Sequence, residues 1–183
     1  KDTQSREARA ICMNDLLKKL EESLLSIKPY LKKYFMMKDL FHIDLHERTN
    51  ETEAFTFAEW ISRIFKELKP FIPKTDNRMV REMCELALEQ PEEKHSLAGL
   101  ANTYFVNQKY LGSLFKQEMK VSFSQYLTFL KMRRAEILLL DKCLKIYEIA
   151  EVLGYEDVEY FSRIFKNTTG WSPSSYRENL FRK

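Results

Sequence analysis

One stretch of this chain occurs twice, and the two copies lie fifty residues apart. Tyr110-Leu-Gly-Ser-Leu-Phe-Lys116 matches Tyr160-Phe-Ser-Arg-Ile-Phe-Lys166, and Ser122-Phe-Ser-Gln-Tyr126 matches Ser172-Pro-Ser-Ser-Tyr176 at the same offset. A constant offset across separate matches indicates two copies of one supersecondary unit. The repeat therefore limits the second half of the chain to two similar units and a connector.

Each copy is typical of a short helix, a tight turn and a second helix. In the first copy, over about residues 96–118, Ser96 and Asn107 are expected to cap the two helices. Short polar side chains suit this role because they accept hydrogen bonds from the free N–H groups of a first turn. In the second copy, over about 146–166, Asp157 is the expected cap of the second helix.

Gly154 supplies the turn of the second copy, because a residue without Cβ takes left-handed backbone angles at little cost. Helix, turn and helix at this spacing form the helix-turn-helix pattern, in which the second helix enters the major groove of DNA. A connecting helix capped by Ser122 is predicted over residues 123–140 and would span about 27 Å. Successive major grooves on one DNA face repeat at about 34 Å, so the connector has a suitable length.

The chain is predicted to be all-helical, with a tandem helix-turn-helix domain over residues 76–183 and a helical segment over 1–75. Only four glycines and five prolines occur among the 183 residues, which suits a mostly helical chain. The polar stretch 48–58 predicts a loop. Because the chain begins with lysine rather than methionine, we expect it to be part of a longer protein.

The N-terminal segment carries apolar residues in a three-four rhythm: Ala10, Met13, Leu17, Leu20, Leu24, Ile27, Leu31 and Tyr34. Such a seam predicts either a dimerising coiled coil or an amphipathic helix packed within its own domain. Pro29 interrupts the seam, because proline lacks an N–H and clashes with the preceding turn. A helix should therefore end near residue 28, and any dimer should be weak.

The remaining features argue against an enzyme, a cofactor site or a membrane protein. No nucleophile–base set or glycine-rich phosphate loop occurs, no apolar run has membrane-spanning length, and the charged first ten residues indicate no signal peptide. The three cysteines are far apart, which fits a reducing cytoplasm. His42 and His46 have metal-ligand spacing but no third ligand, so we expect surface histidines and no metal.

Charge is distributed unevenly along the chain. Residues 1–90 hold 16 Lys or Arg and 16 Asp or Glu, whereas residues 91–183 hold 14 and 11, so the net charge of +3 lies in the second half. This surplus is weak evidence for nucleic-acid binding, so the prediction depends on the motif pattern.

Residues 96–177 resemble the DNA-binding domain of AraC/XylS-type transcription regulators over nearly its full length. The matching residues are Ile146-Tyr-Glu-Ile-Ala-Glu-Val-Leu-Gly-Tyr-Glu-Asp157, the run from Tyr160 to Lys166, Gly170, Pro173 and Tyr176-Arg177. The segment before this domain is similar to the linker of response-regulator-type members.

Three positions depart from the pattern of that family. Lys131 stands where arginine is usual, Tyr155 where phenylalanine is usual, and Lys120 where the first copy usually has glycine. Only Lys120 bears on local structure, because it leaves the turn after the first recognition helix less typical.

The resemblance implies two sets of DNA-contacting residues. Base-facing positions are Gln108, Lys109, Gly112, Ser113, Glu159, Ser162 and Arg163. Phosphate-facing positions are Lys116, Lys131, Lys166 and Arg177. Arg163 suits bidentate pairing with guanine and Glu159 suits cytosine N4, whereas Gly112 and Ser113 have little hydrogen-bonding reach. The first helix is therefore expected to depend on DNA shape or water.

We expect a transcription regulator that acts as an activator in the cytoplasm and contacts two successive major grooves of double-stranded DNA. The expected partners are DNA, a second copy in a weak homodimer, and RNA polymerase; no cofactor is expected. The alternative is a helical protein-interaction module with little intrinsic DNA affinity. A steep loss of affinity with rising salt separates the two, because only the DNA binder displaces counterions.

Overall fold

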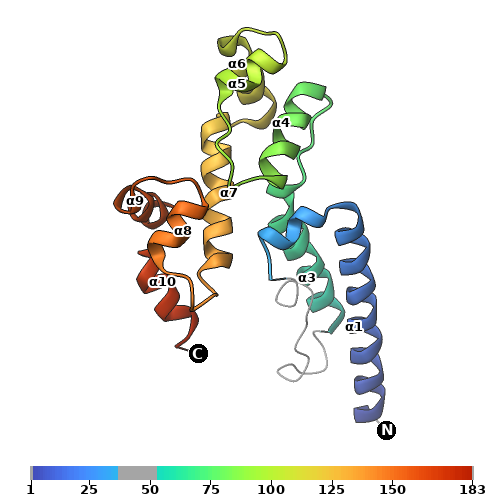
Figure 1. Ribbon diagram of the computed structural model, residues 1–183. Helices are drawn as coiled ribbons and strands as arrows, with labels where there is room; N and C mark the ends of the chain where they lie inside the picture. Colours follow the sequence, from blue (N-terminus) through green and yellow to red (C-terminus); the bar gives the residue numbers. More distant parts are fainter. Residues whose placement is uncertain (1, 37–52, 183) are drawn as a thin grey trace. The chain divides into compact units, whose positions relative to one another are not determined.

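Helices make up all the regular structure in the computed structural model, which describes residues 2–36 and 53–182. The all-helical class predicted from the sequence is confirmed over these residues. The chain divides into two compact units, an N-terminal unit of residues 1–72 and a C-terminal unit of residues 73–183 (Figure 1). The histidine pair His42 and His46 lies outside the described residues.

The N-terminal unit consists of α1 (Asp2–Ile27), the short 3-10 helix η1 (Pro29–Lys33), α3 (Glu53–Leu68) and the 3-10 helix η2 (Lys69–Phe71). The break predicted before Pro29 is present, with proline at the start of η1, where a missing N–H breaks no hydrogen bond.

The loop predicted over residues 48–58 is wrong from Glu53 onward, because α3 already begins there. The segment 53–58 holds no proline or glycine, and a glutamate at a helix N-terminus is favoured by the helix dipole. This first turn lacks the apolar periodicity that predicts a helix.

An aromatic cluster joins the two short 3-10 helices of the N-terminal unit. The Tyr30 hydroxyl donates a hydrogen bond of 2.9 Å to the Phe71 carbonyl oxygen. The rings of Tyr34 and Phe35 each lie 4.8 Å from the Phe71 ring, centroid to centroid. These contacts fix the chain where α1 and α3 end.

The apolar seam of the N-terminal segment is divided between two environments. Leu17, Leu31 and Tyr34 are fully buried. By contrast, Leu20 is 41% exposed and Ile27 is 72% exposed. Part of the seam is therefore buried, and part of it remains on the surface.

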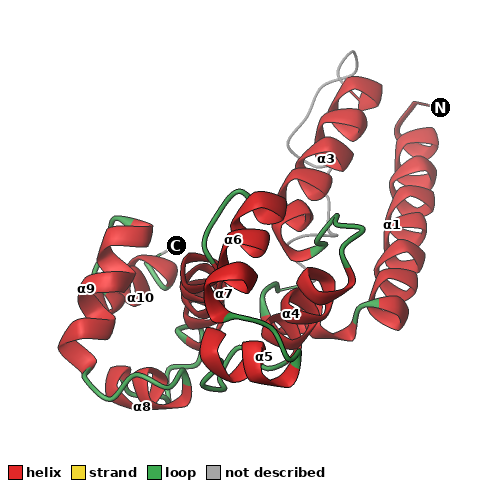
Figure 2. Cartoon of the chain, turned by 90° about the horizontal axis from the view of Figure 1, so that it is seen from above, coloured by secondary structure: helices red, strands yellow, loops and turns green. Residues whose placement is uncertain are grey.

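The C-terminal unit contains the repeat and the helix that precedes it. Its helices are α4 (Arg78–Glu89), α5 (Leu97–Thr103), α6 (Gln108–Met119), α7 (Phe123–Leu138), α8 (Ile146–Val152), α9 (Val158–Thr169) and α10 (Pro173–Leu180). In Figures 1 and 2, α5 and α6 lie together near one end of α7, and α8 to α10 gather at another part of it. The second helix of each copy, α6 in the first and α9 in the second, contacts α7.

Four predicted helix caps are present in the C-terminal unit. The side chain of Ser96 accepts from the Gly99 N–H at 2.9 Å, and that of Asn107 accepts from the Lys109 N–H at 2.8 Å. Ser122 forms a capping box at α7, and Asp157 accepts from two N–H groups at the start of α9. Each cap fixes where a helix begins, and hence which residues face outward.

The turns of the two copies use left-handed backbone at equivalent places. Phe105 has φ 54° before α6, where Gly154 has φ 75° before α9. Lys120 has φ 62° after α6, where Gly170 has φ 83° after α9. The fold therefore imposes left-handed backbone angles at these positions. The second copy has glycine there, whereas the first copy has residues with side chains, which adopt these angles at a steric cost.

The core of the second copy is built around Phe161 and Phe165, both fully buried. Ala150 and Ala135 are also buried there, and their small side chains allow α8 and α7 to approach these rings. Tyr155 lies 5.5 Å from the Phe161 ring, and its burial raises the pKa of its hydroxyl to about 12. The rigid core thus holds α9 by its inner face and leaves its outer face free.

Candidate nucleic-acid interface

The outer face of α6 carries the positions predicted to contact bases in the first copy. Leu111 and Phe115 are fully buried and fix the rotation of the helix about its axis. On the opposite side, Lys109 and Ser113 are exposed, as is Gln108 in the first turn. The structure therefore brings these predicted residues together on one surface.

A shallow groove runs along this face of α6. It is lined by Leu97, Asn107, Gln108, Lys109, Gly112, Ser113 and Lys116. Gly112 forms part of its floor, and an added Cβ there would lie only 2.9 Å from Cδ2 of Leu97. The missing side chain allows Leu97 to pack directly against this part of α6.

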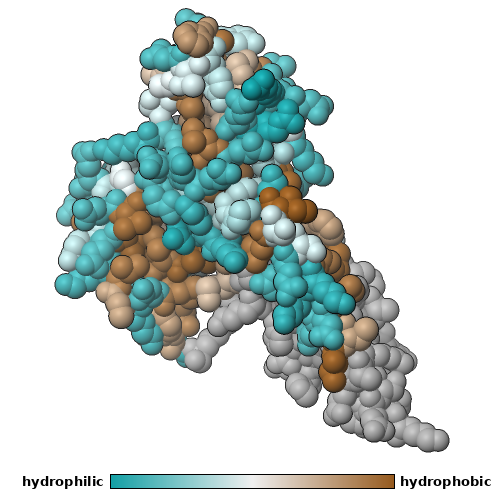
Figure 3. Space-filling model, turned by 45° about the vertical axis from the view of Figure 1, so that its right-hand side comes forward, coloured by the Kyte–Doolittle hydropathy of each residue, from teal (hydrophilic) through white to brown (hydrophobic). Residues whose placement is uncertain are grey.

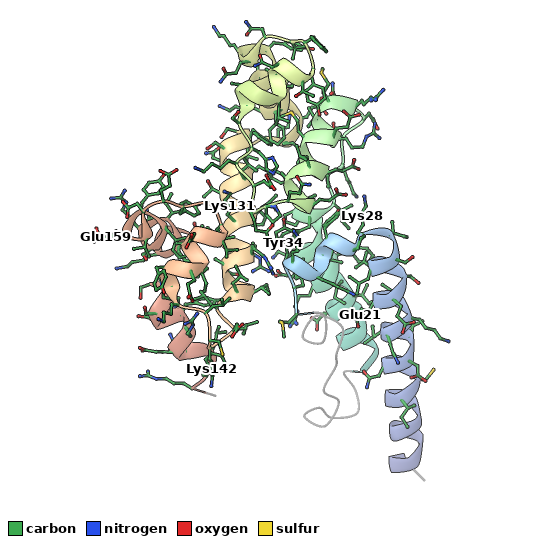
Figure 4. All side chains as sticks on the ribbon, in the orientation of Figure 1. Glu21, Lys28, Tyr34, Lys131, Lys142 and Glu159 are labelled. Carbon is green, nitrogen blue, oxygen red and sulfur yellow. The ribbon has the colours of Figure 1, made fainter. Side chains whose placement is uncertain are left out.

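The outer face of α9 presents the equivalent positions of the second copy. Glu159 and Arg163 are exposed and Ser162 is half-buried; Figure 4 shows Glu159 on the outward side of α9. The Arg163 guanidinium lies 5.3 Å from the centroid of the Tyr160 ring. A cation over an aromatic face is attracted to it, so the ring favours one orientation of this arginine.

Lys116 and Lys166 occupy matching places in the last turns of α6 and α9, and both are exposed. A cation in the last turn also complements the negative end of the helix dipole. The view in Figure 3 shows mainly hydrophilic side chains over α5 and α6. Both helices thus offer a positive group beside their predicted base-facing residues.

Lys131 and Arg177, also predicted to meet phosphates, are held by helix ends of the chain itself. Lys131 Nζ donates to the Leu153 carbonyl oxygen at 2.6 Å, and Arg177 Nε donates to the Leu139 carbonyl oxygen at 3.2 Å. Leu153 and Leu139 are the C-caps of α8 and α7, whose last carbonyls lack helical partners.

Burial lowers the pKa of the Lys131 ammonium, and the nearby Glu92 carboxylate opposes that shift. The structural bonds of Lys131 and Arg177 could not be foreseen from sequence, because they join residues 22 and 38 positions apart. They distinguish these two cations from the nine predicted residues on α6 and α9.

The described residues hold no metal-binding cluster and no membrane-spanning helix. No group of three His, Cys, Asp or Glu side chains suited to a metal ion occurs among them. Burial raises the pKa of the Cys84 thiol to about 12, which keeps it protonated and unreactive. Within the same residues, no helix is long and apolar enough to cross a membrane.

Comparison with known proteins places the repeat in a described group. A family model named helix-turn-helix domain matches residues 100–179. The uncharacterized HTH-type transcriptional regulator YijO of Escherichia coli K12 is 26% identical over 147 residues, covering 78% of this chain and 51% of the relative. The arabinose operon regulatory protein of the same strain is 31% identical over 106 residues, covering 57% and 36%.

A solved structure is similar as well. The C-terminal domain of AraT, a response regulator from Geobacillus stearothermophilus, is 34% identical to this chain with a TM-score of 0.53. The similarity covers 58% of this chain and 88% of that domain. The chain spans about half or less of the length of the two curated relatives, whereas it covers nearly all of the AraT domain.

Proposed function

The chain belongs to the AraC/XylS-type helix-turn-helix family, and from this premise we propose that it is a sequence-specific regulator of transcription acting on duplex DNA. The family is one of DNA-binding regulators, not of enzymes. The observation that carries the proposal is the pair of equivalent helices α6 and α9, both packed on α7 with polar outer faces. α7 has 16 residues and a length of about 24 Å, which suits two adjacent major grooves.

Within this proposal the exposed residues divide by chemistry. Gln108, Lys109, Gly112, Ser113, Glu159, Ser162 and Arg163 would face base edges. Lys116 and Lys166 would neutralise phosphates, which fix the position of a protein on DNA without carrying sequence information. Lys131 and Arg177 would also lie near phosphates, and their bonds to Leu153 and Leu139 hold helix ends in place.

Replacing Lys116 or Lys166 by alanine should weaken binding to every duplex similarly, because a phosphate contact does not depend on sequence. The slope of log affinity against log salt should shrink by about one unit for each lost contact. Affinity measured by fluorescence anisotropy over a salt series tests this. Lys74→Ala, an exposed lysine outside both copies, should leave the slope unchanged.

The proposal fails if the unmodified chain binds duplex DNA weakly and with no salt dependence. That outcome would favour the protein-interaction module instead. An unchanged slope in both lysine variants, with loss on one sequence only, would contradict their assignment to phosphates.

We also propose that α1 supports a weak homodimer. Leu16, Leu20 and Ile27 are 51%, 41% and 72% exposed, and their spacing of four and seven places them on one face of the helix. Exposed apolar side chains on one face favour association with another surface. A dimer would raise affinity for paired sites through effective concentration.

Leu20→Glu should weaken this dimer by about tenfold or more, because burying one leucine contributes about 1.5–3 kcal/mol. Sedimentation equilibrium of the full chain measures the change, with Ser26→Glu, on another side of α1, as control. If the unmodified chain stays monomeric at high concentration, the exposed part of the seam is not a dimer interface.

The family assignment also supports a proposal about the setting in which the protein acts. We propose that the protein acts in the cytoplasm as an activator, with RNA polymerase as a second partner at promoter DNA. We further propose that the N-terminal unit is a linker of the response-regulator type, because the domain similar to 58% of this chain is the C-terminal domain of a response regulator.

A further inference from the structure

The segment between α4 and α5 contacts the turn of the second copy, although more than sixty residues separate them in sequence. Lys94 Nζ lies 2.6 Å from Glu156 Oε1, and Glu156 directly precedes the cap of α9. Lys94 itself stands two residues before Ser96, the cap of α5. The contact therefore joins the entry of one helix-turn-helix to the entry of the other recognition helix.

The connecting helix α7 contacts both the segment before α5 and the turn before α9. Arg134 Nε lies 3.1 Å from Glu92 Oε1, and these two side chains are only 21% and 26% exposed. One turn earlier on α7, Lys131 Nζ donates to the Leu153 carbonyl oxygen at 2.6 Å. We call Glu92, Lys94, Lys131, Arg134 and the turn 153–156 the junction.

Gly154 shows how closely the junction is packed. A Cβ at this position would lie 3.2 Å from the Glu92 carbonyl oxygen and 3.3 Å from Lys131 Nζ. Because the neighbour is backbone, it could not move aside easily, and φ of +75° adds strain for any other residue. A side chain at position 154 would therefore force the segment before α5 to shift by a few tenths of an ångström.

The first copy provides an internal comparison. Phe105 has the same left-handed role in its turn as Gly154 has, yet its side chain is 96% exposed. The fold of a helix-turn-helix therefore does not need its turn to be covered. The close packing around Gly154 is a feature of the second copy alone, which calls for a role beyond folding of that copy.

We propose that the junction fixes the orientation of α9 relative to α6 and thereby sets the half-site spacing that the protein accepts. This inference rests on the proposed function. Otherwise the second copy is connected to the first through α7 and the chain that follows it. One added base pair moves a half-site by about 3.4 Å and rotates it by about 34°. A junction that resists this displacement makes affinity depend on spacing.

The test uses the full chain and a site first selected from a pool of random duplexes. Duplexes with one base pair inserted or deleted between the two half-sites are then compared with the selected spacing. For the unmodified chain, each change of spacing should weaken binding by about tenfold or more, since DNA must be deformed to restore both contacts.

Two kinds of variant separate the junction from general effects of charge. Glu92→Ala removes the partner of Arg134, and Glu93→Ala is the matched control, because Glu93 is an exposed neighbour. Lys94→Glu places two carboxylates side by side, and adding Glu156→Lys restores the pair at unchanged net charge. Lys94 and Glu156 are 71% and 86% exposed, so these substitutions spare the core.

Glu92→Ala and Lys94→Glu should reduce the spacing penalty to about threefold or less, while Glu93→Ala and the exchanged pair keep it. Binding to an isolated half-site should not differ between Glu92→Ala and Glu93→Ala. If all variants bind the selected site and show the spacing penalty of the unmodified chain, the junction has no such role. If no duplex is enriched and the unmodified chain does not bind DNA, the proposed function itself fails, and the inference with it.

Discussion

Phe161→Ala is expected to lower the free energy of unfolding by about 3–5 kcal/mol, a large part of the about 5–15 kcal/mol typical of a folded domain. The Phe161 side chain is fully buried, and its ring lies 5.5 Å from that of Tyr155 and 5.9 Å from that of Phe165. Truncation removes this buried surface and leaves a cavity that the rigid helices around it fill only in part.

Phe105→Ala is the matched control, because it removes the same atoms from a side chain that is 96% exposed. Alanine keeps a Cβ, so the strain at φ 54° persists and stability should change by no more than about 0.5 kcal/mol. Urea unfolding followed by circular dichroism compares the two variants. Equal effects would mean that Phe161 does not carry the core of the second copy.

Local features of the C-terminal unit were accessible from the sequence. Ser96, Asn107, Ser122 and Asp157 all cap the helices that they were predicted to cap, because a cap depends on residues within one turn. The break before Pro29 has an equally local cause. Once the caps are placed, the helical period determines which side chains face outward, and the outer faces of α6 and α9 follow.

Contacts between distant residues were not accessible in this way. Lys131 was predicted to meet a phosphate, and its bond to the Leu153 carbonyl oxygen at the end of α8 was not foreseen. Nothing in the residues around Glu92 indicates that its segment packs against Gly154, since that contact depends on how three elements meet in space. A single amino-acid sequence shows the periodicity of its helices, but it does not show which distant groups the fold brings together.

The N-terminal seam illustrates the same limit of periodicity. A three-four rhythm states that residues share a face, but it does not state what covers that face. Leu17 is buried, whereas Leu20 and Ile27 are exposed. The intradomain interpretation therefore fits the buried part of the seam, and the coiled-coil interpretation fits the exposed part. Only a measurement of the oligomeric state shows whether the exposed part is a dimer interface.

Arg163→Ala should weaken binding to the selected duplex by about 1–3 kcal/mol and relax the preference at one base pair. Arg163 is exposed on the outer face of α9, and the Tyr160 ring lies 5.3 Å from its guanidinium. An oriented guanidinium can donate hydrogen bonds to the two acceptor atoms on the major-groove edge of guanine. Loss of Arg163 leaves these two acceptors without a protein partner. Affinities for the selected duplex and for its single-base variants measure both effects.

Arg81→Ala is the control, because it removes an equal charge from an exposed position on α4, outside the two copies. If Arg163 contacts a base, its removal weakens binding to the selected duplex more than binding to random DNA. Removal of Arg81 weakens binding to both duplexes equally. A loss that is equal on selected and random duplexes would assign Arg163 to a phosphate. Sequence preference at the second half-site would then have to come from Glu159, Ser162 or the shape of the DNA.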